Sequence, residues 1–376
     1  MVDKDGKKVD IMQDLLKLEE EMEGYVKEID ELQVVIKLNG MVDALPDDNQ
    51  RKRMREVLQL PQVVVVGQQS HGKSTTLEMI AGLNFLPRGD GVVTTRPFRI
   101  TIHHHASSTA PYGVVWGGNQ QGSQQGSRFE GKDYAQQLKE KLDTLNPKDY
   151  ISQETADVKL YNPGRGVNLT LVDLPGYTFN HRKDAQARQK VEAMMDEYCS
   201  LKSTIILLVH DCSNDFANNP VQQLIKERYD PDFSRTFGVM TKMNLDSCHK
   251  TTEVMHKARA ESVLGILAND ADSPFSFPTY GWVGITGQNP AEMLTETVQQ
   301  TREKERSFFD GPDFLLSTGE AVSRLPRDAD GKLPLGTDVL RERMGRALKQ
   351  NIKARLPKIL GVLERELDRT SLLLGD

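Results

Sequence analysis

The sequence predicts an α/β protein with a mostly parallel central sheet, and three observations lead to that fold class. Continuous apolar runs, typical of central strands that helices cover on both faces, occur at Val63–Val66, Leu169–Val172, Ile205–Val209 and Phe237–Met240. The stretches between these runs are long enough to form crossover helices. Amphipathic helical patterns flank this central region at both ends of the chain.

Composition and charge exclude several classes of protein. The chain has 376 residues and a net charge of −6, which argues against nucleic acid as the main partner because phosphate binding needs an excess of Lys and Arg. Its three scattered cysteines form neither a metal-binding spacing nor a disulfide framework, so we expect a reducing compartment. No apolar run approaches the roughly 20 residues that span a bilayer, and the N-terminus lacks a signal-peptide core. We therefore expect a cytoplasmic protein that is peripheral wherever it meets a membrane.

Both ends of the chain carry the apolar seam of helices that pack against other helices. Apolar residues over 11–36 alternate in steps of four and three, and a similar pattern covers 340–367. A shorter helix is expected over 47–60. The two seams either pack together as a partial helical bundle, or each docks on a partner or on sequence outside this chain. The expected organisation is bundle-like helices over 1–58, a central domain over 59–335 and a C-terminal bundle helix over 336–376.

The segment GQQSHGKS, residues 67–74, matches the P-loop pattern of a glycine, four residues and then Gly-Lys-Ser. An apolar strand leads into the segment and a helix-forming stretch follows it, which is the context that the motif needs. Backbone N–H groups of such a loop surround phosphate oxygens, and the helix N-terminus adds a favourable dipole. Lys73 is expected to reach the terminal phosphates, and Ser74 to ligate Mg²⁺. The loop predicts a nucleoside triphosphate site.

Two further strand ends carry chemistry that fits such a site. In LTLVDLPG, residues 169–176, Asp173 is placed to hold Mg²⁺ through water and Gly176 to offer its N–H to the γ-phosphate. The sequence Thr241-Lys242-Met243-Asn244 is similar to the T/N-K-x-D order with which proteins read guanine, where the Lys stem covers the base and the Asp accepts from its N–H groups. Three motifs in this order predict a nucleoside triphosphatase.

These and other segments resemble the dynamin superfamily of large GTPases. The resemblance rests on LP at 60–61, VVGQQSHGKST, NFLPRG, GVVTTRP, LTLVDLPG, SNDFAN and a late LP at 356–357, and it covers roughly residues 55–370. It implies an α/β P-loop GTPase domain flanked by N- and C-terminal helices that form part of the bundle signalling element. It also implies hydrolysis of GTP to GDP and phosphate.

The resemblance implies a role for each matching residue. Thr94 would ligate Mg²⁺ and orient the attacking water through its backbone. The loop of Gln69 and Ser70 would position that water and, with the carbonyls of Gly89 and Gly91, a monovalent cation, K⁺ or Na⁺, in place of an arginine finger. The catalytic set would be Gln69, Ser70, Lys73, Thr94 and Gly176, and the metal ligands Ser74, Thr94 and Asp173. The implied nucleotide-binding set is Gly67, Gln68, Gln69, Ser70, His71, Gly72, Lys73, Ser74, Thr75, Gly89, Gly91, Thr241, Lys242, Asn244, Gln288 and Asn289.

Three departures from the compared patterns stand out. Tyr177 follows the LTLVDLPG motif, near the position where a small GTPase has its water-orienting glutamine. Asn244 stands where the family has the base-reading Asp. The segment GITGQNP, residues 284–290, replaces the family's Asn-Arg-Ser loop. Phosphate chemistry typical of the family is therefore expected, whereas selectivity for guanine stays open.

The resemblance also implies partners. A homodimer would form through the GTPase face, and membrane association would use parts that are absent from this chain. Asp215 in SNDFAN stands at the position that would reach the Gln69 loop of a facing molecule; the alternative is that Asp215 caps the helix beginning near Asn219. Two functions remain open: a self-assembling GTPase coupled to membrane remodelling or fission, and a nucleotide-binding scaffold with weak hydrolysis or relaxed base specificity.

Two other segments are given no chemistry. His103, His104 and His105 are consecutive, so on a strand only two could share a face, and no carboxylate or Cys lies nearby in the sequence. Residues 117–131, rich in Gly, Gln and Ser, are expected to form a mobile surface loop.

Overall fold

The computed structural model describes most of the central part of the chain and its C-terminal helix. The described residues are 62–87, 94–105, 110–117, 126–163, 169–177, 186–216, 219–244, 262–270, 273, 275–288, 296–311 and 323–374. The helices predicted over 11–36 and 47–60 lie outside the described residues, as do Gly89, Gly91 and Asn289.

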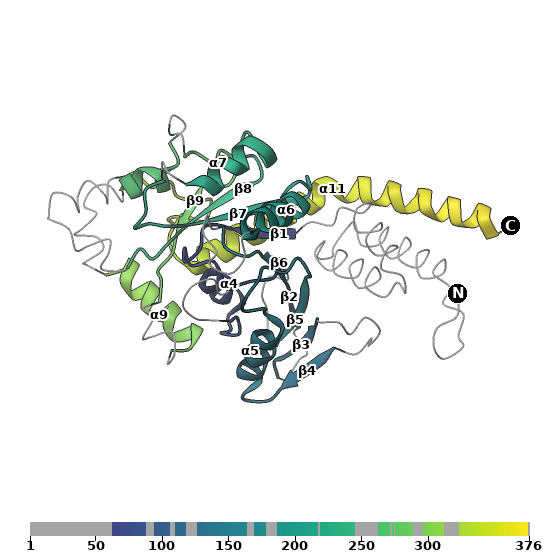
Figure 1. Ribbon diagram of the computed structural model, residues 1–376. Coiled ribbons are helices and arrows are strands. Elements are labelled where there is room, and N and C mark those ends of the chain that lie inside the picture. Colours follow the sequence, from purple (N-terminus) through teal and green to yellow (C-terminus); the bar gives the residue numbers. More distant parts are fainter. Residues whose placement is uncertain are drawn as a thin grey trace. The chain divides into compact units, whose positions relative to one another are not determined.

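The centre of the fold is a sheet of nine strands, counted over the described residues (Figure 1). The strands are β1 (Gln62–Val66), β2 (Phe98–His105), β3 (Tyr112–Trp116), β4 (Ser127–Glu130), β5 (Ala156–Pro163), β6 (Leu169–Asp173), β7 (Thr204–Asp211), β8 (Thr236–Thr241) and β9 (Trp282–Gly284). Their order across the sheet is β4-β3-β5-β2-β6-β1-β7-β8-β9. The block from β6 to β9 is parallel throughout, which confirms the mostly parallel α/β sheet.

The pairing of β2 with β6 departs from that parallel block and matters for the site. The two strands are antiparallel, with Phe98 opposite Asp173. Because β2 begins where β6 ends, the residues just before β2, which include Thr94, reach the same sheet edge as Asp173. Beyond β2 the sheet continues with β5, parallel to β2, and then with β3 and β4 in antiparallel order.

The described helices lie between and after these strands along the chain. They are α4 (Lys73–Ala81), α5 (Tyr134–Leu145), α6 (Ala187–Cys199), α7 (Pro220–Leu224) continued by the π-helical turn η2 (Ile225–Tyr229), α9 (Val298–Phe309) and α11 (Thr337–Leu374), with a short helix over 262–268. α6 contacts β7, α5 contacts β3 and β4, and α4 contacts β6 and α9. Among the described helices, none combines the length and the apolar character that a membrane crossing requires.

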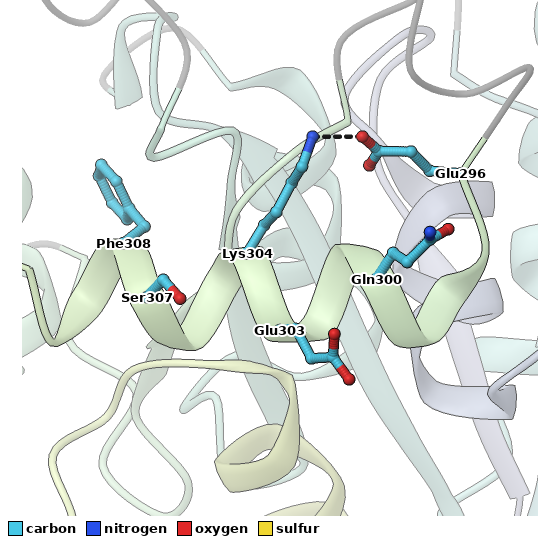
Figure 2. A pocket seen from close by; sticks show the side chains of 6 residues that line it. All are labelled: Glu296, Gln300, Glu303, Lys304, Ser307 and Phe308. Carbon is cyan, nitrogen blue, oxygen red and sulfur yellow. Dashed lines mark hydrogen bonds and ion pairs between the residues drawn. The ribbon is translucent and has the colours of Figure 1, made fainter.

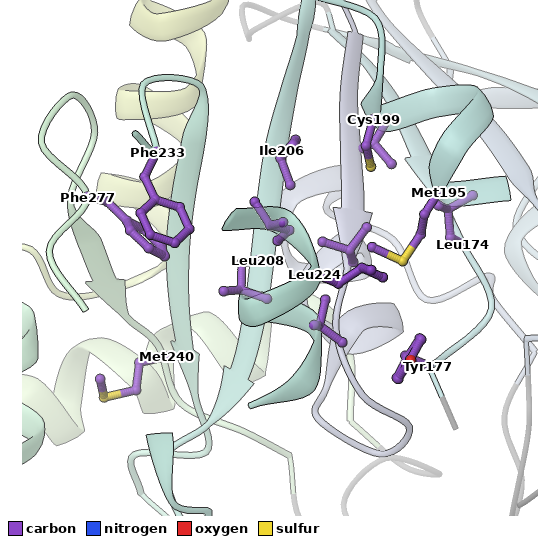
Figure 3. Packing of buried hydrophobic residues seen from close by; sticks show 14 of the residues in the cluster. Leu174, Tyr177, Met195, Cys199, Ile206, Leu208, Leu224, Phe233, Met240 and Phe277 are labelled. Atoms are coloured by element: carbon purple, nitrogen blue, oxygen red, sulfur yellow. The ribbon is translucent and has the colours of Figure 1, made fainter. Parts of the chain in front are cut away.

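An apolar core lies where α6 and α7 pack against the parallel block (Figure 3). Ile206 and Leu208 of β7 meet Met195 of α6 and Leu224 of α7 in this cluster. Every residue of β7 is buried, as expected for a central strand covered on both faces. The core therefore fixes the carboxyl ends of β1, β6, β7 and β8, from which the predicted motifs follow.

The four apolar runs found in the sequence form β1, β6, β7 and β8, so these strand predictions are confirmed. The prediction of a loop over 117–131 is wrong for Ser127–Glu130, which forms β4. This edge strand is mostly exposed and is held by backbone pairing with β3, so its sequence shows no apolar pattern. Polar residues interrupt the apolar patterns of β2, β4 and β5, Gly113 interrupts that of β3, and β9 has only three residues.

The chain divides into two compact units, residues 62–346 and residues 1–61 with 347–376. α11 spans this division and contains Pro357. The helical pattern over 340–367 is confirmed by α11, whose Leu340 and Met344 side chains are buried. The domain boundaries inferred from the sequence remain predictions.

Candidate nucleotide-binding site

The phosphate-binding loop lies between β1 and α4, at the carboxyl edge of the parallel block. Gly67 packs so closely on β7 that a Cβ at this position would lie 2.5 Å from the Val209 carbonyl oxygen. Gly72, with φ of 90°, has the left-handed backbone that precedes α4 and that a glycine adopts without strain. The two glycines thus let the loop turn tightly against the sheet and open onto the helix N-terminus.

Lys73 points back into this loop rather than toward solvent. Its Nζ donates to the carbonyl oxygens of Gly67 and Gln68, at 3.2 and 3.0 Å. Burial lowers the pKa of Lys73 to about 8, although the nearby Asp173 carboxylate raises it. The charge of this buried ammonium group is only partly balanced by Asp173. The group is therefore suited to bind an anionic ligand, because phosphate oxygens replace the favourable interactions with water that burial removes.

Three oxygen-bearing side chains converge beside Lys73. Ser74 Oγ lies 3.4 Å from Thr94 Oγ1, which in turn donates to Asp173 Oδ2 at 3.3 Å. Asp173 is fully buried, and burial raises the pKa of its carboxyl to about 7 although Lys73 and the Thr94 hydroxyl lower it. These three residues are the metal ligands predicted from the sequence, and the fold brings them together.

The donor set fits Mg²⁺. Magnesium prefers oxygen ligands, of which one or two are usually carboxylates. Asp173 Oδ1 is buried and has no hydrogen-bond partner among the described residues, so it could accept from a metal-bound water. A divalent cation there would also favour the ionised carboxylate, against the effect of burial.

The chain after Asp173 runs directly beside the phosphate loop. Gln69 N donates to the Tyr177 carbonyl at 3.2 Å, and Tyr177 N donates to the Gly67 carbonyl at 3.1 Å. A Cβ on Gly176 would lie 2.9 Å from Gln69 Cα and 3.0 Å from Lys73 Nζ. Gly176, Gln69 and Lys73, predicted from separate motifs, are therefore neighbours, and Gly176 is a position where only a glycine fits the native backbone.

The third motif meets the phosphate loop from the opposite side. Thr241 Oγ1 donates to the His71 carbonyl at 2.7 Å. Lys242 Nζ donates to the Ser70 carbonyl at 2.8 Å and pairs with Asp211 Oδ2 at 2.7 Å. Asp211 was missed in the sequence, although it ends an apolar strand just as Asp173 does. That shared position was the signal that could have identified it.

Asn244 is engaged by the loop that follows β9. Its Nδ2 donates to the Gly287 carbonyl at 3.0 Å, and Gly287 N donates to Asn244 Oδ1 at 2.7 Å. Gln288 points away from this loop, since its Nε2 donates to Thr301 Oγ1 of α9 at 2.6 Å and its side chain is buried. Asn244 therefore pairs with the loop after β9, whereas the Gln288 side chain is turned toward α9.

Asp215 lies at the exposed end of the segment that follows β7. It does not cap the next helix, because the N-cap of α7 is Asn219, whose Oδ1 accepts from Val221 N and Gln222 N at 3.0 and 3.2 Å. The capping alternative for Asp215 is thus wrong. The same segment reaches the phosphate loop through Asn214, whose Nδ2 lies 3.3 Å from His71 Nε2.

Other candidate features lie apart from these residues. His103 stacks on Tyr161, with ring centroids 4.7 Å apart, and is buried in the sheet. A shallow groove runs along α9, lined by Glu296, Gln300, Glu303, Lys304, Ser307 and Phe308 (Figure 2). None of the predicted phosphate-binding residues lines this groove, so it is a separate surface feature.

Comparisons with known proteins identify related sequences. A family model described as "Dynamin family" matches residues 63–243, which include the phosphate loop, Asp173 and Lys242. Curated relatives include Dynamin-A of Dictyostelium discoideum, 31% identical over 67% of this chain and 28% of its own length, and Dynamin of Drosophila melanogaster, 33% identical over 82% and 32%. The dynamin-like GTPase msp1, mitochondrial, of Schizosaccharomyces pombe is 33% identical over 73% of this chain and 28% of its own length. The chain spans about a third or less of the length of these relatives.

Proposed function

Because the chain belongs to the dynamin superfamily and contains its GTPase domain, we propose that it binds GTP with Mg²⁺ and hydrolyses it to GDP and phosphate. The observation that carries this proposal is the convergence of Lys73, Ser74, Thr94 and Asp173 at one sheet edge. Catalysis of phosphoryl transfer consists of positioning and charge stabilisation. A lysine ammonium group and a set of metal-binding oxygens at one sheet edge can supply both.

Each residue has a distinct part in the proposed site. Lys73 binds the β- and γ-phosphate oxygens, and Gly176 offers its N–H to the γ-phosphate. Ser74, Thr94 and Asp173 would hold Mg²⁺ between them. When bound, the metal neutralises negative charge on the phosphates.

In this proposal, the phosphate loop positions the water that attacks the γ-phosphate. Gln69 and Ser70 position it together with the Thr94 backbone. Tyr177 offers its backbone to Gln69 but has no side-chain amide with which to orient water. The family resemblance adds a monovalent cation, K⁺ or Na⁺, held with the carbonyls of Gly89 and Gly91.

Assembly and membrane remodelling extend the proposal to the whole protein. The related proteins are much longer than this chain, so lipid contact is proposed to use parts outside it, with the protein peripheral to a membrane from the cytoplasm. We further propose that two GTPase domains pair across their nucleotide faces and that Asp215 reaches the Gln69 loop of the facing molecule. The exposed place of Asp215 on a segment that contacts His71 supports this pairing.

A second function is a nucleotide-binding scaffold with relaxed base specificity. The observation that favours it is the double pairing of Asn244 with Gly287, since an amide already satisfied by backbone is less available to guanine. Hydrolysis and affinity measured with GTP, ATP and XTP side by side distinguish the two functions.

The proposed GTPase is tested by two substitutions. Lys73→Ala should abolish tight binding of GTP, because it removes the mobile cation of the phosphate loop. Thr94→Ala should leave GTP affinity nearly intact and lower kcat by about 10²–10³, the usual effect of losing one well-placed transition-state contact. Affinity is measured by titration of a fluorescent GTP analogue, and kcat by phosphate release.

Thr101→Ala is the matched control for Thr94→Ala. Thr101 lies on β2, and its hydroxyl pairs with Thr170 across the sheet, 3.4 Å away and outside the site. This control should hydrolyse GTP at the parent rate. A Thr94→Ala variant as active as the control would remove Thr94 from the catalytic set.

A further inference from the structure

Glu305 is a buried carboxylate that the proposed reaction does not use. It lies in α9, and only 3% of its surface is exposed. Burial raises the pKa of its carboxyl above the usual range, while backbone N–H groups of Thr337 and Thr286 lower it. An ionisable group in such a place is costly unless hydrogen bonds compensate it, so its partners identify what it does.

The two oxygens of Glu305 bind two different elements. Oε1 accepts from Thr286 N at 3.0 Å and from Thr286 Oγ1 at 3.4 Å. Oε2 accepts from Thr337 N at 2.7 Å. Thr337 is the first residue of α11, where N–H groups have no partner within the helix and where negative charge is favourable.

Thr286 belongs to the loop on the base side of the site. Its neighbour Gly287 pairs in both directions with Asn244, and a Cβ on Gly287 would lie 2.8 Å from Lys242 Cγ. The loop over 285–288, here called the base loop, is thus in contact with the Lys242 stem, which is proposed to cover the nucleotide base. Its far end is anchored on α9 by Gln288 and Thr301, one turn before Glu305.

We propose that Glu305 is a positioning residue that couples the base loop to the first turn of α11. The inference rests on the proposed nucleotide-binding function. One planar carboxylate holds Thr286 and Thr337 at a fixed separation, so a nucleotide that orders the base loop also orders the start of α11. A direct hydrogen bond also joins β9 to the chain just before α11: Gly336 N donates to the Gly284 carbonyl at 2.7 Å.

Two variants at Glu305 isolate this bridge, and a third is the matched control. Glu305→Gln keeps the shape but turns one oxygen into an NH₂ group, which cannot accept from both backbone N–H groups. Glu305→Asp keeps the charge and shortens the reach, so it cannot span both partners and provides a second test if the amide variant folds poorly. Glu303→Gln makes the first exchange on the same helix at an exposed residue of the groove shown in Figure 2.

The measurement is hydrogen exchange of the full chain with and without a non-hydrolysable GTP analogue. In the parent and in Glu303→Gln, the analogue should slow exchange both in the phosphate loop (67–74) and in the first turn of α11 (337–341). In both Glu305 variants, exchange at 337–341 should be about tenfold faster or more, and most of its response to the analogue should be lost, because only the pairing of Gly336 with Gly284 remains. Protection of the phosphate loop should persist, which shows that nucleotide is still bound.

Each other outcome has a distinct meaning. A purely structural role for Glu305 predicts a lower melting temperature with the nucleotide response at 337–341 retained, and that result would overturn the coupling. Protection of the phosphate loop without any response of α11 in the parent overturns it as well. If the analogue does not protect the phosphate loop of the parent, the proposed nucleotide binding fails and the coupling fails with it.

Discussion

At the scale of single residues, Asn244 holds the loop after β9 from the position that is proposed to read the nucleotide base. Its Nδ2 donates to Gly287 O and its Oδ1 accepts from Gly287 N, so the backbone engages both the NH₂ group and the oxygen of the amide. A carboxylate could accept from the N–H but would face the carbonyl oxygen without a proton to share. In the proposed site, the residue at 244 therefore has two competing partners, the base loop and the nucleotide base.

Asn244→Asp should shift that balance toward guanine. One oxygen of the new carboxylate can still accept from Gly287 N, and the other no longer donates to the backbone, so the carboxylate should accept from the guanine ring N–H and amino group. The preference for GTP over XTP should therefore rise by roughly 5- to 150-fold, the equivalent of about 1–3 kcal/mol. The melting temperature should fall because the contact with Gly287 O is lost. Titrations with GTP and XTP, together with thermal unfolding, measure both effects.

Asn269→Asp is a matched control for this change. Asn269 also donates to a backbone carbonyl at 3.0 Å and accepts from the N–H of the same residue, Phe277, at 2.7 Å. The control should lose comparable stability without a change in base preference. An unchanged GTP-to-XTP ratio in Asn244→Asp would mean that other residues read the base.

At the scale of elements, Arg235 joins the end of α6, the start of β7 and the end of η2. Its Nη1 donates to the carbonyls of Leu201 and Thr204 at 2.9 and 2.8 Å, and its Nη2 to those of Cys199 and Tyr229 at 3.2 and 2.7 Å. The side chain is 11% exposed, and the planar guanidinium group presents donors in the directions that these four oxygens require.

Arg235→Lys should destabilise the fold although it keeps the charge. An ammonium group cannot reach all four carbonyls, so buried acceptors lose their partners at a cost of about 2–3 kcal/mol. The free energy of unfolding in urea measures this loss. Arg228→Lys is the control, because Arg228 lies in the same region with a half-exposed side chain, and it should change stability by less than about 0.5 kcal/mol. Equal losses in the two variants would contradict the role of Arg235.

At the scale of the whole molecule, the proposed dimer makes activity depend on protein concentration. Specific activity should rise with concentration, and the protein should be monomeric with GDP and dimeric with GDP and aluminium fluoride. The Asp215→Ala variant should not dimerise, and its specific activity should not rise with protein concentration. Its thermal stability should stay near that of the parent, because the substitution removes the preorganisation of the Gln69 loop and no packing contact. Light scattering and phosphate release follow the two properties.

Asp232→Ala, which removes another exposed carboxylate, should dimerise as the parent does. If the rate of GTP hydrolysis does not depend on protein concentration and no dimer forms with GDP and aluminium fluoride, activation by a facing molecule is excluded.

The proposed phosphate side of the site could be predicted from the sequence because each of its parts falls in a short local motif. Gly67 to Ser74 are consecutive, running from the loop into the first turn of α4, and Asp173 ends an apolar strand. The base side could not, since the partner of Asn244 lies 43 residues later in a loop without a recognised motif. Glu305 was equally hidden, because Glu303, two residues earlier on the same helix, is exposed and nothing local distinguishes them. Tertiary contact decides which of the two carboxylates is enclosed.

The central position of β1 has a consequence for the making of the protein. The strand pairs with β6 and β7, and the hydroxyl that fixes the His71 carbonyl belongs to Thr241, 170 residues further along the chain. While synthesis proceeds from the N-terminus, the complete GQQSHGKS motif therefore emerges long before the neighbours that shape it. Such distant pairing forms slowly, because the entropy of closing long loops must be overcome first. A nascent chain that stops short of β8 would carry the whole GQQSHGKS segment without the Thr241 hydroxyl that holds its His71 carbonyl.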